Sequence, residues 1–327
     1  MKYAFTRRAA GALAALALSS VVGSAFAAYP EKTIRIVVGF PAGQATDIIA
    51  RIAAKKLQEA LQQPVFVDNK PGAAGIIGSE MVAKANPDGY TLLVGSSGTM
   101  AINISLYSKL PYHPLKDFVP ISELAVVPLF LASNPNFVAQ TAGDLVREAK
   151  ANPGKLNYAS SGSGVTSHLT MELFKHAQGI NMVHVPYKGS PAAVTDLIGG
   201  QVPVMIDTGA ALIPHYRSGK LRLLAVASKA RNPAVPNVPT MAEAGLGNFE
   251  APAWIGIAAP KGTPKEIIET LHKALSSNWL DSPEVRDQLT NLGAEPILSR
   301  PEEFARYIQS EIDKWAVAVK LSGAKVD

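Results

Sequence analysis

Hydrophobic and polar positions along the chain follow two alternating patterns. Short apolar runs typical of strands occupy 33–40 (TIRIVVGF), 65–69 (VFVDN) and 90–96 (YTLLVGS). Segments 47–61 and 75–86 instead space their apolar residues along one face of a helix. Strands alternating with helices predict parallel α/β sheets.

The alternation resumes after the apolar stretch 118–135. Strands are expected at 156–162, 182–187, 202–207 and 221–228. Helices are expected at 141–154, where Gly154 is the expected stop, and at 167–179, 190–201, 263–277, 282–293 and 300–323.

Two apolar stretches have the character of crossovers between domains: Val126–Ala132, and Trp254–Pro260, which ends in a proline. They predict a discontinuous first domain, 28–128 with 254–327, and a second domain, 129–253. Clefts between two lobes are a common place for a ligand.

The first 27 residues have the pattern of an export signal. A basic start (MKYAFTRR) precedes an apolar run that is shorter than the roughly 20 residues of a membrane span. Small residues at Ala25 and Ala27 form an A-x-A site, so we expect cleavage after Ala27 and a periplasmic protein. The pair Arg7 and Arg8 raises the twin-arginine route, but the residues that follow it favour the general route.

Removing this leader changes the charge balance. The whole chain has 31 basic and 26 acidic residues, and three of the basic residues lie in the leader. The mature chain is therefore nearly neutral, and no basic run remains to indicate a nucleic-acid partner. The sequence contains no cysteine, so the fold does not depend on disulfides.

Three strand-to-helix turns share one chemistry. They are FPAGQATD (40–47), GSSGTMAIN (95–103) and YASSGSGVTSH (158–168), all rich in Gly, Ser or Thr. The first N–H groups of a helix lack internal partners and carry the positive end of the helix dipole. Glycines let the backbone approach an anion and hydroxyls add donors, so these turns are candidate anion sites. Plain turn chemistry is the alternative.

Three polar side chains have two interpretations each. Asp47 either complements the dipole of its helix or accepts hydrogen bonds from a ligand or water. Asp207, at the end of a strand, either faces the cleft or caps the next helix. His168 either faces the cleft or caps its own loop.

Catalytic and metal constellations are not evident. His168, Glu172 and His176 share a helical face, but i to i+8 spans about 12 Å, too far for one ion. The loops lack the endings of nucleotide-binding motifs and of a hydrolase elbow, in which Thr99 would have to be glycine. The sequence thus predicts no enzyme, no metal and no cofactor, and the three tryptophans are expected to pack in the core.

Long motifs occur along the mature chain in this order: FPAGQATDIIAR, DNKPGAAGIIG, NPDGYTLLVGSSGT, ANPGKLNYASSGSGVTSHLTMELFK, HVPYKGSPAAVTDLIGGQV, and VPTMAEAGL followed by WIGIAAPKGTP. Together they closely resemble the Bug family, the periplasmic substrate-binding proteins of tripartite tricarboxylate transporters. The resemblance implies a two-lobed α/β periplasmic binding protein (type II-like), each lobe a sheet flanked by helices, with two crossover strands joining the lobes.

The resemblance also implies a function and a site. Members bind small organic acids, namely dicarboxylates, tricarboxylates, acidic amino acids and aromatic acids, and deliver them to membrane permease subunits. Carried over to this sequence, the ligand contacts would be Phe40, Ala42, Gly43, Gln44, Asp47, Ser96, Ser97, Thr99, Ser160, Gly162, Ser163, Gly164, Thr166, His168, Tyr187 and Asp207.

This chain departs from the family pattern at two loops. The family usually reads PAGG where this chain has Gln44, and GAGGNIG where it has GAAGIIG with Ala74 and Ile76. Gln44 either supplies an amide to the ligand or covers the pocket. Two other functions remain open: a sensor that presents its closed form to a signalling receptor, and an exported hydrolase that uses a serine of SSGSG.

Overall fold

The computed structural model describes residues 29–277 and 279–322, with side chains described to residue 320. From Lys32 onward they form one compact unit. The predicted signal peptide and its cleavage site lie outside the described residues. No helix in the described part is long and apolar enough to span a bilayer.

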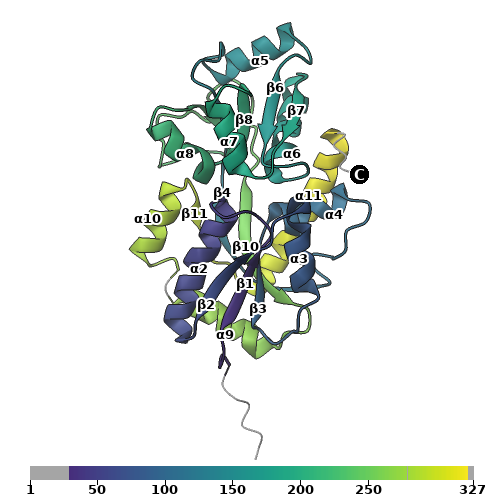
Figure 1. Cartoon of the computed structure of the whole chain (residues 1–327), viewed down its shortest axis with the longest axis vertical. Coiled ribbons are helices and arrows are strands. Elements are labelled where there is room, and N and C mark those ends of the chain that lie inside the picture. Colours follow the sequence, from purple (N-terminus) through teal and green to yellow (C-terminus); the bar gives the residue numbers. More distant parts are fainter. Residues whose placement is uncertain (1–28, 278, 323–327) are drawn as a thin grey trace, which may run out of the picture. The chain divides into compact units, whose positions relative to one another are not determined.

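Two sheets organise this unit. The first has the order β11-β4-β10-β3-β1-β2, with strands Glu295–Pro296, Phe118–Val127, Ala253–Pro260, Thr91–Ser96, Ile34–Val38 and Val65–Asn69. The second has the order β7-β6-β8-β5-β9, with strands Val183–Pro186, Asn157–Ser160, Val204–Thr208, Leu129–Ser133 and Arg222–Val226. Figure 1 shows the elements of the second sheet above those of the first.

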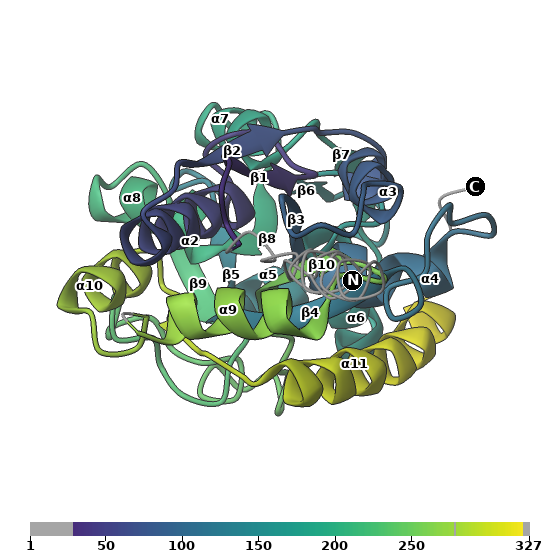
Figure 2. The same cartoon turned by 90° about the horizontal axis from the view of Figure 1, so that it is seen from below.

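Helices cover both faces of the first sheet. α2 (Ala45–Leu61) packs with α9 (Lys265–Ser276) on one face, and α3 (Ile76–Ala83) and α11 (Pro301–Ser322) share a core cluster on the other (Figure 2). The short helices η1 (Ala73–Gly75), η2 (Gly98–Ile102) and α4 (Asn103–Leu106) follow the loops after β2 and β3, and α10 (Pro283–Asn291) precedes β11.

Helices also flank the second sheet. α7 (Ser190–Ile198) and α8 (Gly209–Arg217) bury their apolar residues against one face, while α6 (Thr166–Gln178) packs on β6 and β8. α5 (Ala142–Ala151) begins with a Thr141–Asp144 capping box. It ends at Ala151, so the predicted stop at Gly154 is three residues late, because Asn152 already caps the helix.

The expectation of parallel sheets is wrong in part, because both sheets are mixed. β1, β2 and β3 are parallel, but β10 runs antiparallel to β3 and β4, and β5 runs antiparallel to β8 and β9. The cause is the path of the chain. It leaves the first sheet along β4 and returns along β10, so these two adjacent strands must run in opposite directions.

The chain passes between the sheets at Pro128, since β4 ends at Val127 and β5 begins at Leu129. It returns between β9 and β10. The predicted domain ranges, 28–128 with 254–327 and 129–253, stay a prediction.

The tryptophans are packing residues, as expected. Trp254, Trp279 and Trp315 are fully or almost fully buried. The indole N–H groups of Trp254 and Trp315 both donate to one oxygen of Glu311, at 3.0 Å each.

Candidate functional site

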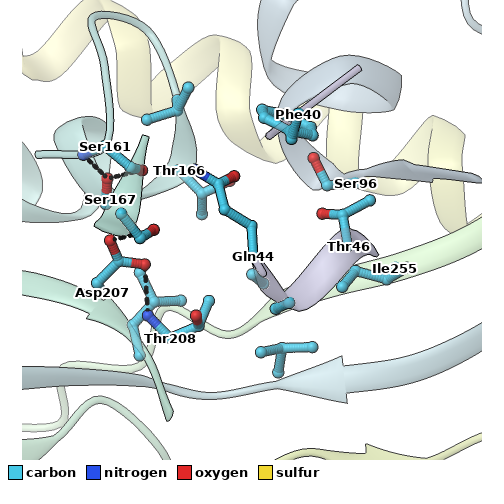
Figure 3. Close-up of a pocket in the computed structure, with 16 residues that line it drawn as sticks. Phe40, Gln44, Thr46, Ser96, Ser161, Thr166, Ser167, Asp207, Thr208 and Ile255 are labelled. Carbon is cyan, nitrogen blue, oxygen red and sulfur yellow. Dashed lines mark hydrogen bonds between the residues drawn. The ribbon is translucent and has the colours of Figure 1, made fainter. Parts of the chain in front are cut away.

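The three Gly/Ser/Thr-rich turns meet around one small cavity of about 50 Å³. Gln44 and Thr46 come from the first turn, Ser96 from the second, and Ser161 and Thr166 from the third (Figure 3). Ser190, Asp207 and Thr208 of the second sheet close another side. Apolar residues of the connecting strands complete the lining: Val127, Leu129, Ala253 and Ile255.

A larger cavity of about 540 Å³ shares part of its lining with the small one. The shared residues are Phe40, Gln44, Ser161 and Val165. The rest comes from Gly39 and Pro41, from the loop Pro71–Gly75, from Tyr107, and from Gly162, Ser163 and the segment Tyr187–Gly189, in loops that follow strands of the second sheet. The volume lies within the range of about 300–1,000 Å³ that is usual for small-molecule sites.

Five helices begin at these cavities, and none has a side-chain cap. Their N-cap residues all line a cavity: Gln44 for α2, Gly75 for α3, Val165 for α6, Gly189 for α7 and Thr208 for α8. By contrast, α5 and α10, away from the cavities, are capped by their own Thr141 and Ser282. The cavities are thus surrounded by the positive ends of helices and by backbone donors that suit an anion.

Asp47 holds the first turn in shape. Its carboxylate accepts from the backbone N–H of Gly43 at 3.0 Å, from Asn69 Nδ2 at 2.9 Å and from Arg51 Nε at 3.1 Å. Burial alone raises the pKa of Asp47, but the hydrogen bonds from Arg51, Gly43 and Asn69 outweigh it and hold the pKa below its ordinary value. Asn69 also donates to Phe40 O, which ties the end of β2 to this turn.

Ser167 and His168 hold the third turn from within. The Ser161 N–H donates to Ser167 Oγ at 3.1 Å, and the two hydroxyls are 2.9 Å apart. The Gly164 N–H donates to His168 Nδ1 at 3.1 Å, so that nitrogen carries no proton. Burial lowers the pKa of His168, which keeps the ring neutral.

Asp207 is a buried carboxylate in the wall of the small cavity. It accepts from Ser190 Oγ at 2.8 Å and from its neighbour's backbone, Thr208 N, at 2.7 Å. Burial raises the pKa of Asp207 to about 6, although both hydrogen bonds oppose the rise.

Residues 49–323 match the family described as "Tripartite tricarboxylate transporter family receptor". Protein BugT of Bordetella pertussis is 41% identical to this chain over 299 residues, which is 91% of each protein. The chain belongs to the Bug family of tripartite tricarboxylate transporter receptors.

Solved structures of relatives share the fold of this Bug-family receptor. A Rhodopseudomonas palustris protein solved with adipate is 36% identical, with a TM-score of 0.88 over 91% of this chain and 100% of its own. MatC of the same species, solved with bound malate, is 36% identical, with a TM-score of 0.82 over 89% and 100%. The predicted fold class and family are therefore confirmed, and the family consists of periplasmic solute-binding receptors rather than enzymes.

Half of the predicted site residues of this Bug-family receptor line a cavity, and half do not. Those that do are Phe40, Gln44, Ser96, Gly162, Ser163, Thr166, Tyr187 and Asp207. Those that lie outside both linings are Ala42, Gly43, Asp47, Ser97, Thr99, Ser160, Gly164 and His168. Several of the second group instead fix the loops, since Thr99 Oγ1 accepts from Ser96 N at 3.0 Å and Ser97 Oγ lies 3.2 Å from Thr166 Oγ1.

A serine–histidine pair is present but is not placed as a nucleophile. Ser160 Oγ lies 2.6 Å from His184 Nε2. Ser160 is 0% exposed, donates to Gly162 O and lines neither cavity. Its hydroxyl therefore fixes the turn between β6 and α6.

Sequence reasoning missed part of the larger cavity in this receptor. Ala73 and Ala74, in its wall, have φ angles of 46° and 50°, a left-handed conformation that alanine adopts rarely. The glycine-rich PGAAG segment was the available signal. Lys188 and Tyr107 gave no local signal, because only the long-range packing brings them to the cavity. Within the described residues no cluster of His, Asp or Glu is suited to hold a metal ion.

Proposed function

We propose that this receptor captures a small organic carboxylate in the two adjoining cavities and delivers it to a membrane transporter of the tripartite tricarboxylate type. The candidate ligands are dicarboxylates, tricarboxylates, acidic amino acids and aromatic acids. Export to the periplasm with a cleaved signal peptide at 1–27 belongs to the same proposal.

The main support for carboxylate binding is the set of helix N-termini around the cavities. Five uncapped helix N-termini point their donors at cavities whose described lining contains a single cation, Lys188. Preorganised N–H and O–H donors hold a carboxylate by charge-assisted hydrogen bonds without a buried partner cation. Relatives solved with adipate and with malate support this ligand chemistry.

A thermal-shift screen of the mature protein tests the binding step. Adipate, malate, citrate, glutamate and benzoate represent the candidate classes. An acid at a hundred times its dissociation constant should raise the free energy of unfolding by about 2.7 kcal/mol, a clear increase in Tm. If none of these acids, nor any in a wider acid panel, shifts the Tm, the proposal of carboxylate capture is contradicted.

Delivery is tested in cells. Uptake of the radiolabelled acid that binds should be lost when the gene for this receptor is deleted, and should return when the gene is restored. Unchanged uptake in the deletion strain would contradict the transport role while leaving the binding role intact.

A further inference from the structure

Gln44 occupies the junction of the two cavities, because it lines both. It is the N-cap residue of α2, but its side chain makes no capping hydrogen bond. Figure 3 shows the side chain extended from the start of α2 toward Ser161 and Thr166, which lie between β6 and the start of α6. It also reaches Gly189, where a Cβ atom would lie only 2.9 Å from Gln44 Nε2.

The amide nitrogen of Gln44 is buried and unpaired. The residue is 8% exposed, and among the described residues Nε2 has no hydrogen-bond partner. A buried polar group left without a partner costs about 1–3 kcal/mol. Such a cost is tolerated where something outside the protein supplies the missing acceptor.

Several other polar groups in the same lining already have partners. The hydroxyls of Ser161 and Ser167 bond to each other. Asp207 receives hydrogen bonds from Ser190 and Thr208. The Gln44 amide nitrogen, in a residue that lines both cavities, lacks such a partner among the described residues.

We propose that Gln44 Nε2 donates a hydrogen bond to a carboxylate oxygen of the bound acid at the junction of the two cavities. The inference rests on the proposed carboxylate-binding function. Gln44 is then a specificity-determining residue, because it selects for an acid whose carboxylate reaches this point. It completes its contact only when the loops of the two sheets are together, as they are here.

Two substitutions at Gln44 distinguish a hydrogen bond to the ligand from a side chain that merely covers the pocket. Gln44→Glu keeps the shape but replaces the donor with a negative charge, so affinity for adipate or malate should fall about 100-fold or more. Gln44→Met removes the hydrogen bond alone and should cost about tenfold. Gln201→Glu, on an exposed residue outside both cavities, adds the same charge and should bind as the wild type does. Calorimetric titration of adipate and malate measures all four proteins.

Wild-type affinity in Gln44→Glu would overturn the proposal. A second readout needs no ligand. If the amide is unpaired in the free protein, Gln44→Met should unfold at the same or a higher Tm than the wild type, and a Tm lower by several degrees would overturn the proposal. If the wild type binds neither acid, the proposed ligand class is contradicted. The Tm of ligand-free Gln44→Met then still tests whether the Gln44 amide is unpaired.

Discussion

At the scale of single residues, the side chains near the cavities have two different roles. Asp47 accepts hydrogen bonds from Gly43, Arg51 and Asn69, and His168 accepts one from Gly164 of its own turn. Both lie outside the cavity linings. Gln44 and Asp207 line the cavities, one with an unpaired donor and the other with a buried charge. Both kinds of residue are polar and buried, so only their contacts distinguish them.

Asp207 should make stability depend on pH. Its pKa is about 6 in the folded protein, above its ordinary value of 3.8, so the folded state holds the proton more tightly than the unfolded state. Its contribution to the free energy of unfolding is therefore fully present below about pH 4 and is lost as the pH rises through 6. Asp207→Asn should raise the Tm of the ligand-free protein at pH 8 by a few degrees, and the gain should vanish near pH 4.

Differential scanning fluorimetry from pH 4 to pH 8 measures this difference. Asp287→Asn, at an exposed position on α10, is the matched control and should follow the wild type throughout. A Tm difference for Asp207→Asn that is independent of pH would mean that Asp207 is not the titrating group.

At the scale of elements, a stack of aromatic rings packs beside the third turn, the one between β6 and α6. The rings of His168 and His184 are 3.9 Å apart, and Tyr158 stacks on His184 at 5.0 Å. Glu172 and Lys175 of α6 form an ion pair beside the stack, with Lys175 over the Tyr158 ring. The stack joins β6, β7 and α6, so the turn between β6 and α6 depends on uncharged imidazoles.

Acid should weaken this stack. Burial, with a smaller contribution from the neighbouring His168 and Lys175, lowers the pKa of His184 to about 3. The unfolded chain therefore takes up the proton first, near pH 6.5, and the contribution of His184 to the free energy of unfolding is lost as the pH falls from there toward 3. His184→Phe keeps a ring in the stack, so its Tm should fall less steeply between pH 7 and pH 4 than that of the wild type.

The quantity to compare is the slope of Tm against pH, not the Tm itself. His184→Phe also loses the hydrogen bond to Ser160, so its Tm should already be lower at pH 7. His176→Phe, at an exposed position near the end of α6, should retain the wild-type slope. Equal slopes for His184→Phe and the wild type would exclude His184 as the source of acid sensitivity.

At the scale of the whole molecule, the two sheets contact each other through their loops. Ser97 Oγ lies 3.2 Å from Thr166 Oγ1, and the Gln44 side chain reaches the Gly189 segment. Such contacts form only when the two halves are together, so a ligand that adds further contacts across the same gap favours the closed arrangement.

Gly189 tests this coupling. Its φ is +113°, and a Cβ there would lie 2.9 Å from Gln44 Nε2 and 3.1 Å from Pro41 Cγ. Gly189→Ala should displace the Gln44 side chain from between the loops and press on Pro41, and so lower the affinity for the acid that binds by about tenfold. It should also abolish the decrease in radius of gyration that the ligand causes in small-angle scattering of the wild type.

Gly219→Ala is the matched control, because Gly219 also has a positive φ, +72°, but no atom lies within 4 Å of a Cβ built there. It tests a positive φ without the obstruction, although the strain at Gly189 is greater, so its affinity and scattering change should be those of the wild type. A Gly189→Ala protein that closes normally on its ligand would contradict the coupling.

Most of the strands and helices, the three polar turns and the family could be predicted from the sequence alone. These are local properties: periodicity of apolar residues, turn chemistry and motif spacing are all written in neighbouring positions. The tertiary structure decided the mixed strand directions, because the chain leaves along β4 and returns along β10. It also decided which polar side chains face the cavities. Asp47 and Gln44 belong to one short turn, yet Asp47 is occupied by its hydrogen bonds, one of them from the distant Asn69, while Gln44 reaches the Gly189 segment of the other half. Both outcomes depend on residues that are far away in the sequence.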